Sequence, residues 1–137
     1  MGPFAIRDID HIVLRVADLQ RACDFWIGVL GCKLERSRED LGLWQLRAGR
    51  SMIDLVPIGG TLGMKGGAAP GAEGRNVDHI CLRIEPFNGE AIREYLLAQG
   101  LKPGEIASRF GAEGEGPSIY VTDPDGNVVE LKGPPES

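Results

Sequence analysis

The sequence has few cysteines, no long apolar run and no leader-like N-terminus, and each absence excludes a class of protein. Cys23, Cys32 and Cys81 are scattered and form no CxxC pair, so we expect free thiols that serve as small apolar residues. No apolar stretch approaches the roughly 18–20 residues of a transmembrane helix. The N-terminus lacks the charged-then-apolar layout of a signal peptide. We therefore expect a soluble cytoplasmic protein.

The sequence also has no Lys/Arg cluster. Its 15 basic and 20 acidic residues give a net charge of −5 over 137 residues. Proteins that coat phosphates or anionic membranes need a basic patch, so we expect neither nucleic acid nor membrane as a partner. The length fits one domain, residues 1–137, with a core of its own.

Glycine is abundant, at 20 residues, and is concentrated in two segments. Seven glycines lie in residues 59–74 and three in 111–116. At that density glycine disfavours helices and strands, which predicts two loops. The first loop is too long for a routine connection, so it is either a linker between modules or a lid over a substrate. The second has the same two interpretations.

The halves on either side of the first loop are a repeat. Residues 10–16 read Asp-His-Ile-Val-Leu-Arg-Val and residues 78–84 read Asp-His-Ile-Cys-Leu-Arg-Ile, identical at five of seven positions. A helical apolar stripe follows each, over 19–30 and 89–99. Asp18 and Asn88 are good N-caps. The predicted strands are 10–16, 32–37, 43–47, 52–58, 78–84, 101–108, 118–122 and 127–132.

This order predicts an α+β fold of two βαβββ modules, residues 8–58 and 77–133, joined by the linker 59–76. One such module leaves a face of its sheet uncovered. Two modules related by a pseudo-twofold axis can pair into an incomplete barrel-like sheet around a cleft.

Strand alternation places chemistry on the face away from the helices. If Leu14 and Leu82 cover the helices, His11 and His79 point the other way. In the last strand of each module, Asp54 and Glu130 stand between apolar neighbours. A carboxylate buried there needs a partner, and a metal is a common one. Two imidazoles and two carboxylates predict a site for a divalent cation: Zn, Ni, Mn, Fe or Co.

These residues resemble the vicinal oxygen chelate superfamily, which includes glyoxalase I, extradiol dioxygenases, methylmalonyl-CoA epimerase, fosfomycin-resistance thiol transferases and bleomycin-resistance proteins. The resemblance covers roughly residues 8–133. It lies in residues 9–19, 25–26, 29–31, 52–56, 77–82 and 120–131. It implies His11, His79 and Glu130 as metal ligands, with Glu130 and Asp54 in catalysis. The implied activity is a glyoxalase-like lyase or isomerase that acts on a small oxygen-bearing substrate.

Two positions depart from particular members. Asp54 stands where glyoxalase I carries a glutamate and the epimerase a glutamine, so it is either a short metal ligand, a base beside the metal or a substrate contact. Val13 stands where the thiol transferases usually carry a threonine. Two alternatives remain open: a binding protein without enzymatic activity, like the bleomycin-resistance proteins, and an extradiol-type dioxygenase.

Other residues are candidates for substrate binding. Ser118 and Tyr120 resemble phosphonate contacts of the thiol transferases, and could also merely pack. Arg15 and Arg83 share the face of the histidines, where they either bind an anionic substrate or form salt bridges. Trp44 or Gln45 lines the cleft, and we select Trp44 as a substrate contact. The resemblance also implies a homodimer.

Overall fold

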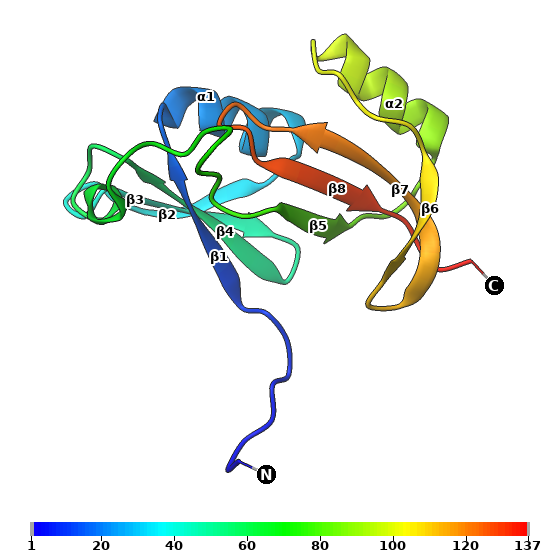
Figure 1. The fold of residues 1–137 in the computed structure, drawn as a ribbon, viewed down its shortest axis with the longest axis horizontal. Coiled ribbons are helices and arrows are strands. Elements are labelled where there is room, and N and C mark those ends of the chain that lie inside the picture. Colours follow the sequence, from blue (N-terminus) through cyan, green and yellow to red (C-terminus); the bar gives the residue numbers. More distant parts are fainter. Residues whose placement is uncertain (1, 137) are drawn as a thin grey trace. The chain divides into compact units, whose positions relative to one another are not determined.

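The computed structural model describes residues 2–136, and the chain divides into two compact units, residues 1–69 and 70–137. The first unit contains β1 (His11–Val16), α1 (Leu19–Cys23), a π-helical segment η1 (Asp24–Val29), β2 (Lys33–Arg38), β3 (Leu43–Ala48), β4 (Ser51–Pro57) and a short 3-10 helix η2 (Gly63–Gly66). The second contains β5 (His79–Arg83), α2 (Gly89–Ala98), β6 (Ala107–Gly111), β7 (Gly114–Thr122) and β8 (Val128–Lys132) (Figure 1).

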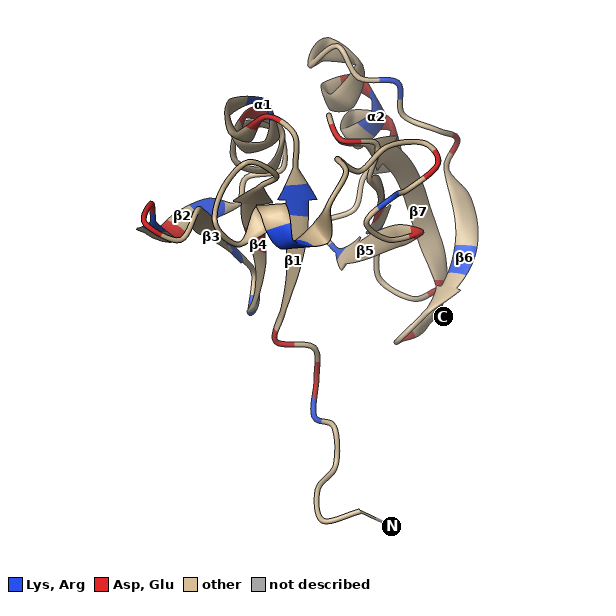
Figure 2. Cartoon of the chain, turned by 60° about the vertical axis from the view of Figure 1, so that its left-hand side comes forward, with Lys and Arg blue, Asp and Glu red and all other residues tan. Residues whose placement is uncertain are grey.

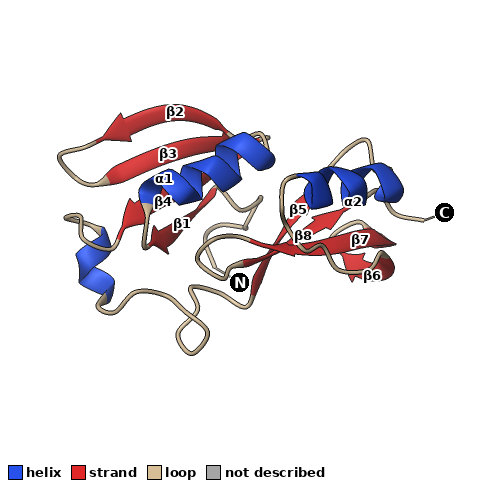
Figure 3. Cartoon of the chain, turned by 90° about the horizontal axis from the view of Figure 1, so that it is seen from above, coloured by secondary structure: helices blue, strands red, loops and turns tan. Residues whose placement is uncertain are grey.

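The two units have the same topology. Their strand orders are β1-β4-β3-β2 and β5-β8-β7-β6, and in each the first strand runs parallel to the last while the other pairs are antiparallel. The helix of each unit lies against one face of its sheet (Figure 3). The predicted α+β fold of two βαβββ modules is therefore confirmed.

The helix-facing side of each sheet forms the core. In the first unit Leu14, Val16 and Leu55 are buried, together with Trp26 from the helical segment. In the second, Ile119, Val129 and Leu131 are buried with Leu96 of α2. Full burial of such a side chain contributes about 1.5–3 kcal/mol each. The alternation in β1 and β5 thus follows the predicted parity, which leaves the histidines on the opposite face.

The helix expected over residues 19–30 begins as predicted, with the Asp18 side chain accepting from the Arg21 N–H at 3.0 Å. Its second half is wound as a π-helix, in which the Leu30 N–H donates to the Phe25 carbonyl at 3.0 Å. The adjacent rings of Phe25 and Trp26 are both buried in an edge-to-face contact. Apolar spacing does not distinguish the two windings, because they differ in which carbonyl each N–H reaches.

The loop predicted over residues 111–116 is wrong, because this segment forms part of the β6–β7 hairpin. Gly116 is required by a close approach: a Cβ there would lie 2.5 Å from the Pro134 carbonyl oxygen. Glycine in a strand often marks such an approach rather than a flexible loop. The strand predicted over 101–108 begins only at Ala107, since Pro103 and Gly104 disfavour a ladder.

In the predicted linker, residues 59–69 are held to the first unit by Arg15. Its guanidinium donates to the carbonyls of Gly63 at 2.9 Å and Ala68 at 2.8 Å, and to that of Gly67. Among the described residues, no helix is long and apolar enough to cross a membrane. Lysines and arginines are interspersed with acidic residues along both units (Figure 2).

The turn before β8 depends on Asp123, which supports a stability prediction. Its buried carboxylate accepts from the backbone N–H groups of Asp125 and Asn127 at 2.9 and 2.7 Å and from the Asn127 side chain at 2.8 Å. We expect Asp123→Ala to lower the free energy of unfolding by about 3 kcal/mol, because it leaves buried donors without an acceptor. Urea denaturation measures this. Asp40→Ala is the control, since that carboxylate is exposed and pairs with Arg38 at the surface, and an equal loss in both variants would contradict the prediction.

Candidate functional site

The first unit places His11 and Asp54 on one face of its sheet. In the parallel β1–β4 ladder Asp54 lies opposite Val13, which is two residues beyond His11 on the same face of β1. Asp54 and His11 are therefore diagonal neighbours on this face. Asp54 is only 3% exposed, and its Oδ1 atom has no hydrogen-bond partner. Burial raises the pKa of Asp54, and a hydrogen bond from Gln45 and the charge of His11 act in the opposite direction. An orphaned buried carboxylate oxygen is costly unless a cation or donor joins it.

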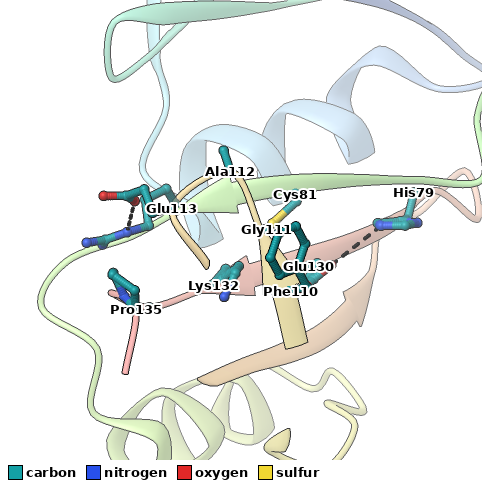
Figure 4. Close-up of a pocket in the computed structure, with 11 residues that line it drawn as sticks. His79, Cys81, Phe110, Gly111, Ala112, Glu113, Glu130, Lys132 and Pro135 are labelled. Atoms are coloured by element: carbon teal, nitrogen blue, oxygen red, sulfur yellow. Dashed lines mark hydrogen bonds and ion pairs between the residues drawn. The ribbon is translucent and has the colours of Figure 1, made fainter. Parts of the chain in front are cut away.

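The second unit repeats this arrangement with His79 and Glu130. The Nε2 atom of His79 lies 3.4 Å from Oε1 of Glu130 (Figure 4). Glu130 is 5% exposed, and its Oε2 atom has no hydrogen-bond partner. Each unit therefore carries one imidazole and one buried carboxylate oxygen without a partner.

Both histidines are oriented by the aspartate that precedes them. Nδ1 of His11 lies 2.7 Å from Asp10, and Nδ1 of His79 lies 2.8 Å from Asp78. An ionised carboxylate only accepts, so each Nδ1 donates its proton there, and in the neutral imidazole this leaves the lone pair on Nε2. These bonds raise the pKa of His11 and lower that of Asp78. Metal-binding histidines are typically held in this way.

The donors therefore fit a divalent cation in their chemistry. Imidazole nitrogen and carboxylate oxygen suit the first-row metals, and the two orphaned oxygens are the groups a cation would neutralise. Within residues 2–136, no group of three or more His, Cys, Asp or Glu residues is positioned to hold a metal. What each unit presents is an imidazole–carboxylate pair.

A cavity of about 240 Å³ opens on the same face of the second unit. Its walls come from β5, β8 and the β6–β7 hairpin (Figure 4). Besides His79 and Glu130 it is lined by Cys81, Arg83, Phe110, Gly111, Ala112, Glu113, Lys132, Gly133 and Pro135. Burial, reinforced by the charge of Glu130, raises the pKa of the Cys81 thiol to about 11. Cys81 is therefore a neutral thiol at neutral pH.

Tyr120 lies beside the His79–Glu130 pair. It is opposite Glu130 in the β7–β8 ladder. Its ring makes an edge-to-face contact with the ring of His79, and the two ring centres are 5.9 Å apart. The Arg109 guanidinium lies over the Tyr120 ring, 4.5 Å from its centre. Ser118 is fully buried, and its hydroxyl and carbonyl accept from Arg109 at 2.9 and 2.8 Å. Ser118 thus holds Arg109, and Arg109 supports Tyr120.

Arg15 and Arg83, the two arginines of the repeated motif, each form hydrogen bonds within the protein. Arg15 binds the backbone carbonyls of residues 63–68 described above. Arg83 donates to Glu113, in the β6–β7 turn, at 2.7 Å and to the Ile84 carbonyl at 2.7 Å. Their predicted role in binding an anionic substrate stays a prediction.

The choice of Trp44 needs correction. The β3–β4 register pairs Gln45 with Asp54 and Trp44 with Leu55. Trp44 therefore lies on the helix-facing side, and Gln45 is the residue on the face of His11. A single short strand does not reveal its own parity, whereas its register with β4 does.

Sequence reasoning also missed four residues of this face. Asp10 and Asp78 were visible as a doubled Asp-His dipeptide, a signal that could have identified them. Lys132, two residues beyond Glu130 and thus on the same face, could have been found by parity. Arg109 lay in a segment whose strand was misplaced by several residues.

Comparisons with known proteins identify the family and support the fold. The family model of the Glyoxalase/Bleomycin resistance protein/Dioxygenase superfamily matches residues 8–131. The lactoylglutathione lyase of Escherichia coli O157:H7 is 33% identical over 132 residues, which cover 88% of each chain. The virulence protein STM3117 of Salmonella typhimurium is 30% identical over 129 residues, covering 90% of this chain and 81% of that protein. Its crystal structure matches with a TM-score of 0.78 and 27% identity, covering 96% of this chain and 99% of that one.

Proposed function

Because the chain belongs to the Glyoxalase/Bleomycin resistance protein/Dioxygenase superfamily, we propose that it is a divalent-metal-dependent enzyme of the glyoxalase type. The reaction would be a lyase or isomerase step on a small oxygen-bearing substrate. The observation that carries the proposal is the doubled pair: in each unit an imidazole held by an aspartate accompanies a buried carboxylate oxygen that has no partner. The 33% identity to a lactoylglutathione lyase supports the lyase class.

The repeat predicts that His11 and Asp54 of one module and His79 and Glu130 of the other serve the same cation. The donor set suits Zn, Ni, Mn, Fe or Co. Such a cation, when bound, supplies Lewis-acid polarisation of a substrate oxygen.

The chain's own residues have separable roles. Asp10 and Asp78 hold the imidazoles so that each Nε2 faces outward from its aspartate. Asp54 is one methylene shorter than the glutamate of glyoxalase I, and we propose that its orphaned carboxylate oxygen accepts the substrate proton. Tyr120, fixed by Arg109, orients the substrate beside His79.

The test is metal removal and replacement on purified protein. We expect near one metal per chain by elemental mass spectrometry, in line with one site. Chelation should abolish the conversion of methylglyoxal and glutathione to lactoylglutathione, and adding back Zn, Ni, Mn, Fe or Co one at a time should restore it with at least one of them. No bound metal under any addition would overturn the mechanism. A bound metal without turnover on oxygen-bearing substrates would identify a binding protein instead.

We also propose that the protein is a homodimer located in the cytoplasm, from the family resemblance. Light scattering coupled to size exclusion measures its mass in solution. A mass of one chain at micromolar concentration would exclude the dimer.

A further inference from the structure

The side chain of Lys132 on β8 is buried although it carries a charge. It is 5% exposed, and lysine is seldom so buried unless it is paired. Its Nζ atom donates to the carbonyl oxygens of Arg109 at 2.8 Å and Gly116 at 3.2 Å. No carboxylate of the described residues forms an ion pair with it. An ammonium has three donors, and these carbonyls use two of them.

The hairpin opposite is built to make room for this lysine. A Cβ on Gly111 would lie 2.5 Å from Cε of Lys132, and one on Gly116 would lie 3.1 Å from its Nζ. Both glycines stand in strands, where their lack of a side chain costs stability. The two positions therefore accommodate the buried ammonium.

Lys132 also lines the cavity that contains Glu130 and His79 (Figure 4). The other cation in the lining, Arg83, is already neutralised by Glu113 at 2.7 Å. Glu130 is two residues away on the same strand face, a separation of about 6.6 Å. Because no carboxylate among residues 2–136 forms an ion pair with Lys132, it is the cation of this cavity that lacks an anionic partner.

We propose that Lys132 binds an oxyanion of the substrate, a carboxylate or a phosphate-type group, in the cavity of the second unit. The substrate is then a small anionic compound whose chelating oxygens lie a few atoms from its anionic group. The cavity of about 240 Å³ is below the usual range for drug-sized ligands, roughly 300–1,000 Å³, which favours a small molecule. The chelating end of this substrate rests on the proposed function, whereas the anion site does not.

The test titrates metal-free protein with sodium phosphate and, separately, with sodium acetate, at constant ionic strength set by sodium chloride. Amide resonances of Gly111, Gly116 and Cys81 are followed by NMR. We expect saturable shifts with at least one anion, and the two titrations distinguish a phosphate-type from a carboxylate preference. Because no metal is present, failure here is distinguishable from failure of the metal mechanism.

Lys132→Met keeps the length of the side chain and removes its charge. We expect it to weaken anion binding by about tenfold or more, the loss of one charge-assisted hydrogen bond. Lys33→Met is the control, an exposed lysine on β2 of the other unit, and should leave binding unchanged. Equal binding by wild type and Lys132→Met would show that the lysine only ties the hairpin to β8, and would overturn the proposal.

A second variant keeps the proposal testable if Lys132→Met does not fold. Glu113→Gln removes a negative charge from the cavity lining, while Arg83 keeps its longer ion pair with Glu85 at 3.6 Å. We expect it to tighten anion binding several-fold. Absence of saturable shifts in wild type, or no tightening in Glu113→Gln, would then overturn the proposal.

Discussion

Glu130→Gln is expected to make the metal-free protein more stable and to abolish metal binding. Glu130 is buried, and its Oε2 atom lacks a hydrogen-bond partner. Removing a buried charge that has one oxygen without a partner, while keeping the shape of the side chain, should raise the free energy of unfolding by about 1–3 kcal/mol. The same change removes a metal ligand. We expect affinity for the metal to fall by more than the roughly 10–100-fold that loss of a supporting carboxylate costs.

The measurement is the melting temperature with and without the metal found by elemental analysis. Wild type should gain stability on metal addition, because a ligand that binds only the folded state stabilises it. Without metal, Glu130→Gln should have a higher melting temperature than wild type, and adding metal should not raise it further. Glu113→Gln is the matched control, since that carboxylate is exposed and paired with Arg83. A Glu130→Gln variant that is less stable without metal, or that still gains stability with it, would contradict this account.

The opposite signs of these two effects separate function from folding. If Glu130 were kept for stability alone, its replacement would lower the free energy of unfolding of the protein. A buried carboxylate that costs stability in the free protein is explained by what it binds. The same reasoning applies to Asp54 in the first unit, whose Oδ1 atom is also buried without a partner.

The fold could be predicted because the sequence repeats itself. The Asp-His-Ile motif at residues 10–12 and 78–80 marks the first strand of each module, and the apolar alternation after it fixes which face meets the helix. The predicted α+β class and the βαβββ order follow from these local patterns. Periodicity is a strong signal where a strand or helix is amphipathic.

What was missed depends on contacts between segments distant in sequence. The glycines of the β6–β7 hairpin look like loop residues, and only the approach of Pro134 and Lys132 shows why Gly116 and Gly111 stand in strands. The face of Trp44 depends on its register with β4. The extent of burial of Lys132 depends on the hairpin that covers it. A local sequence pattern does not predict any of these contacts.

The candidate site was predicted unevenly for the same reason. Parity identified the faces of His11, His79, Asp54 and Glu130, because each belongs to a strand with clear alternation. The burial of the two carboxylates, and the oxygen that each leaves without a partner, required the packed structure. The metal-binding role of all four stays a prediction that the experiments above address.

Asp10→Ala and Asp78→Ala are each expected to weaken metal binding although neither aspartate is a proposed ligand. Each carboxylate accepts from Nδ1 of the following histidine, at 2.7 Å for Asp10 and 2.8 Å for Asp78, and so fixes the tautomer that leaves Nε2 free. Without it the ring can rotate, and the neutral imidazole can place its proton on either nitrogen. We expect a loss of about 10–100-fold in metal affinity for each variant.

Competition with a metal-binding dye measures this affinity. Asp8→Ala is the control, because that exposed carboxylate also precedes β1 but forms its ion pair with Arg7. Asp78→Asn should retain more affinity than Asp78→Ala, since the amide oxygen can still accept from Nδ1. This ordering separates positioning of the imidazole from the general effect of removing a negative charge, which would weaken the two Asp78 variants equally. If Asp8→Ala weakened metal binding as much as Asp10→Ala, the role assigned to the Asp-His pairs would fail, because charge alone would account for both losses.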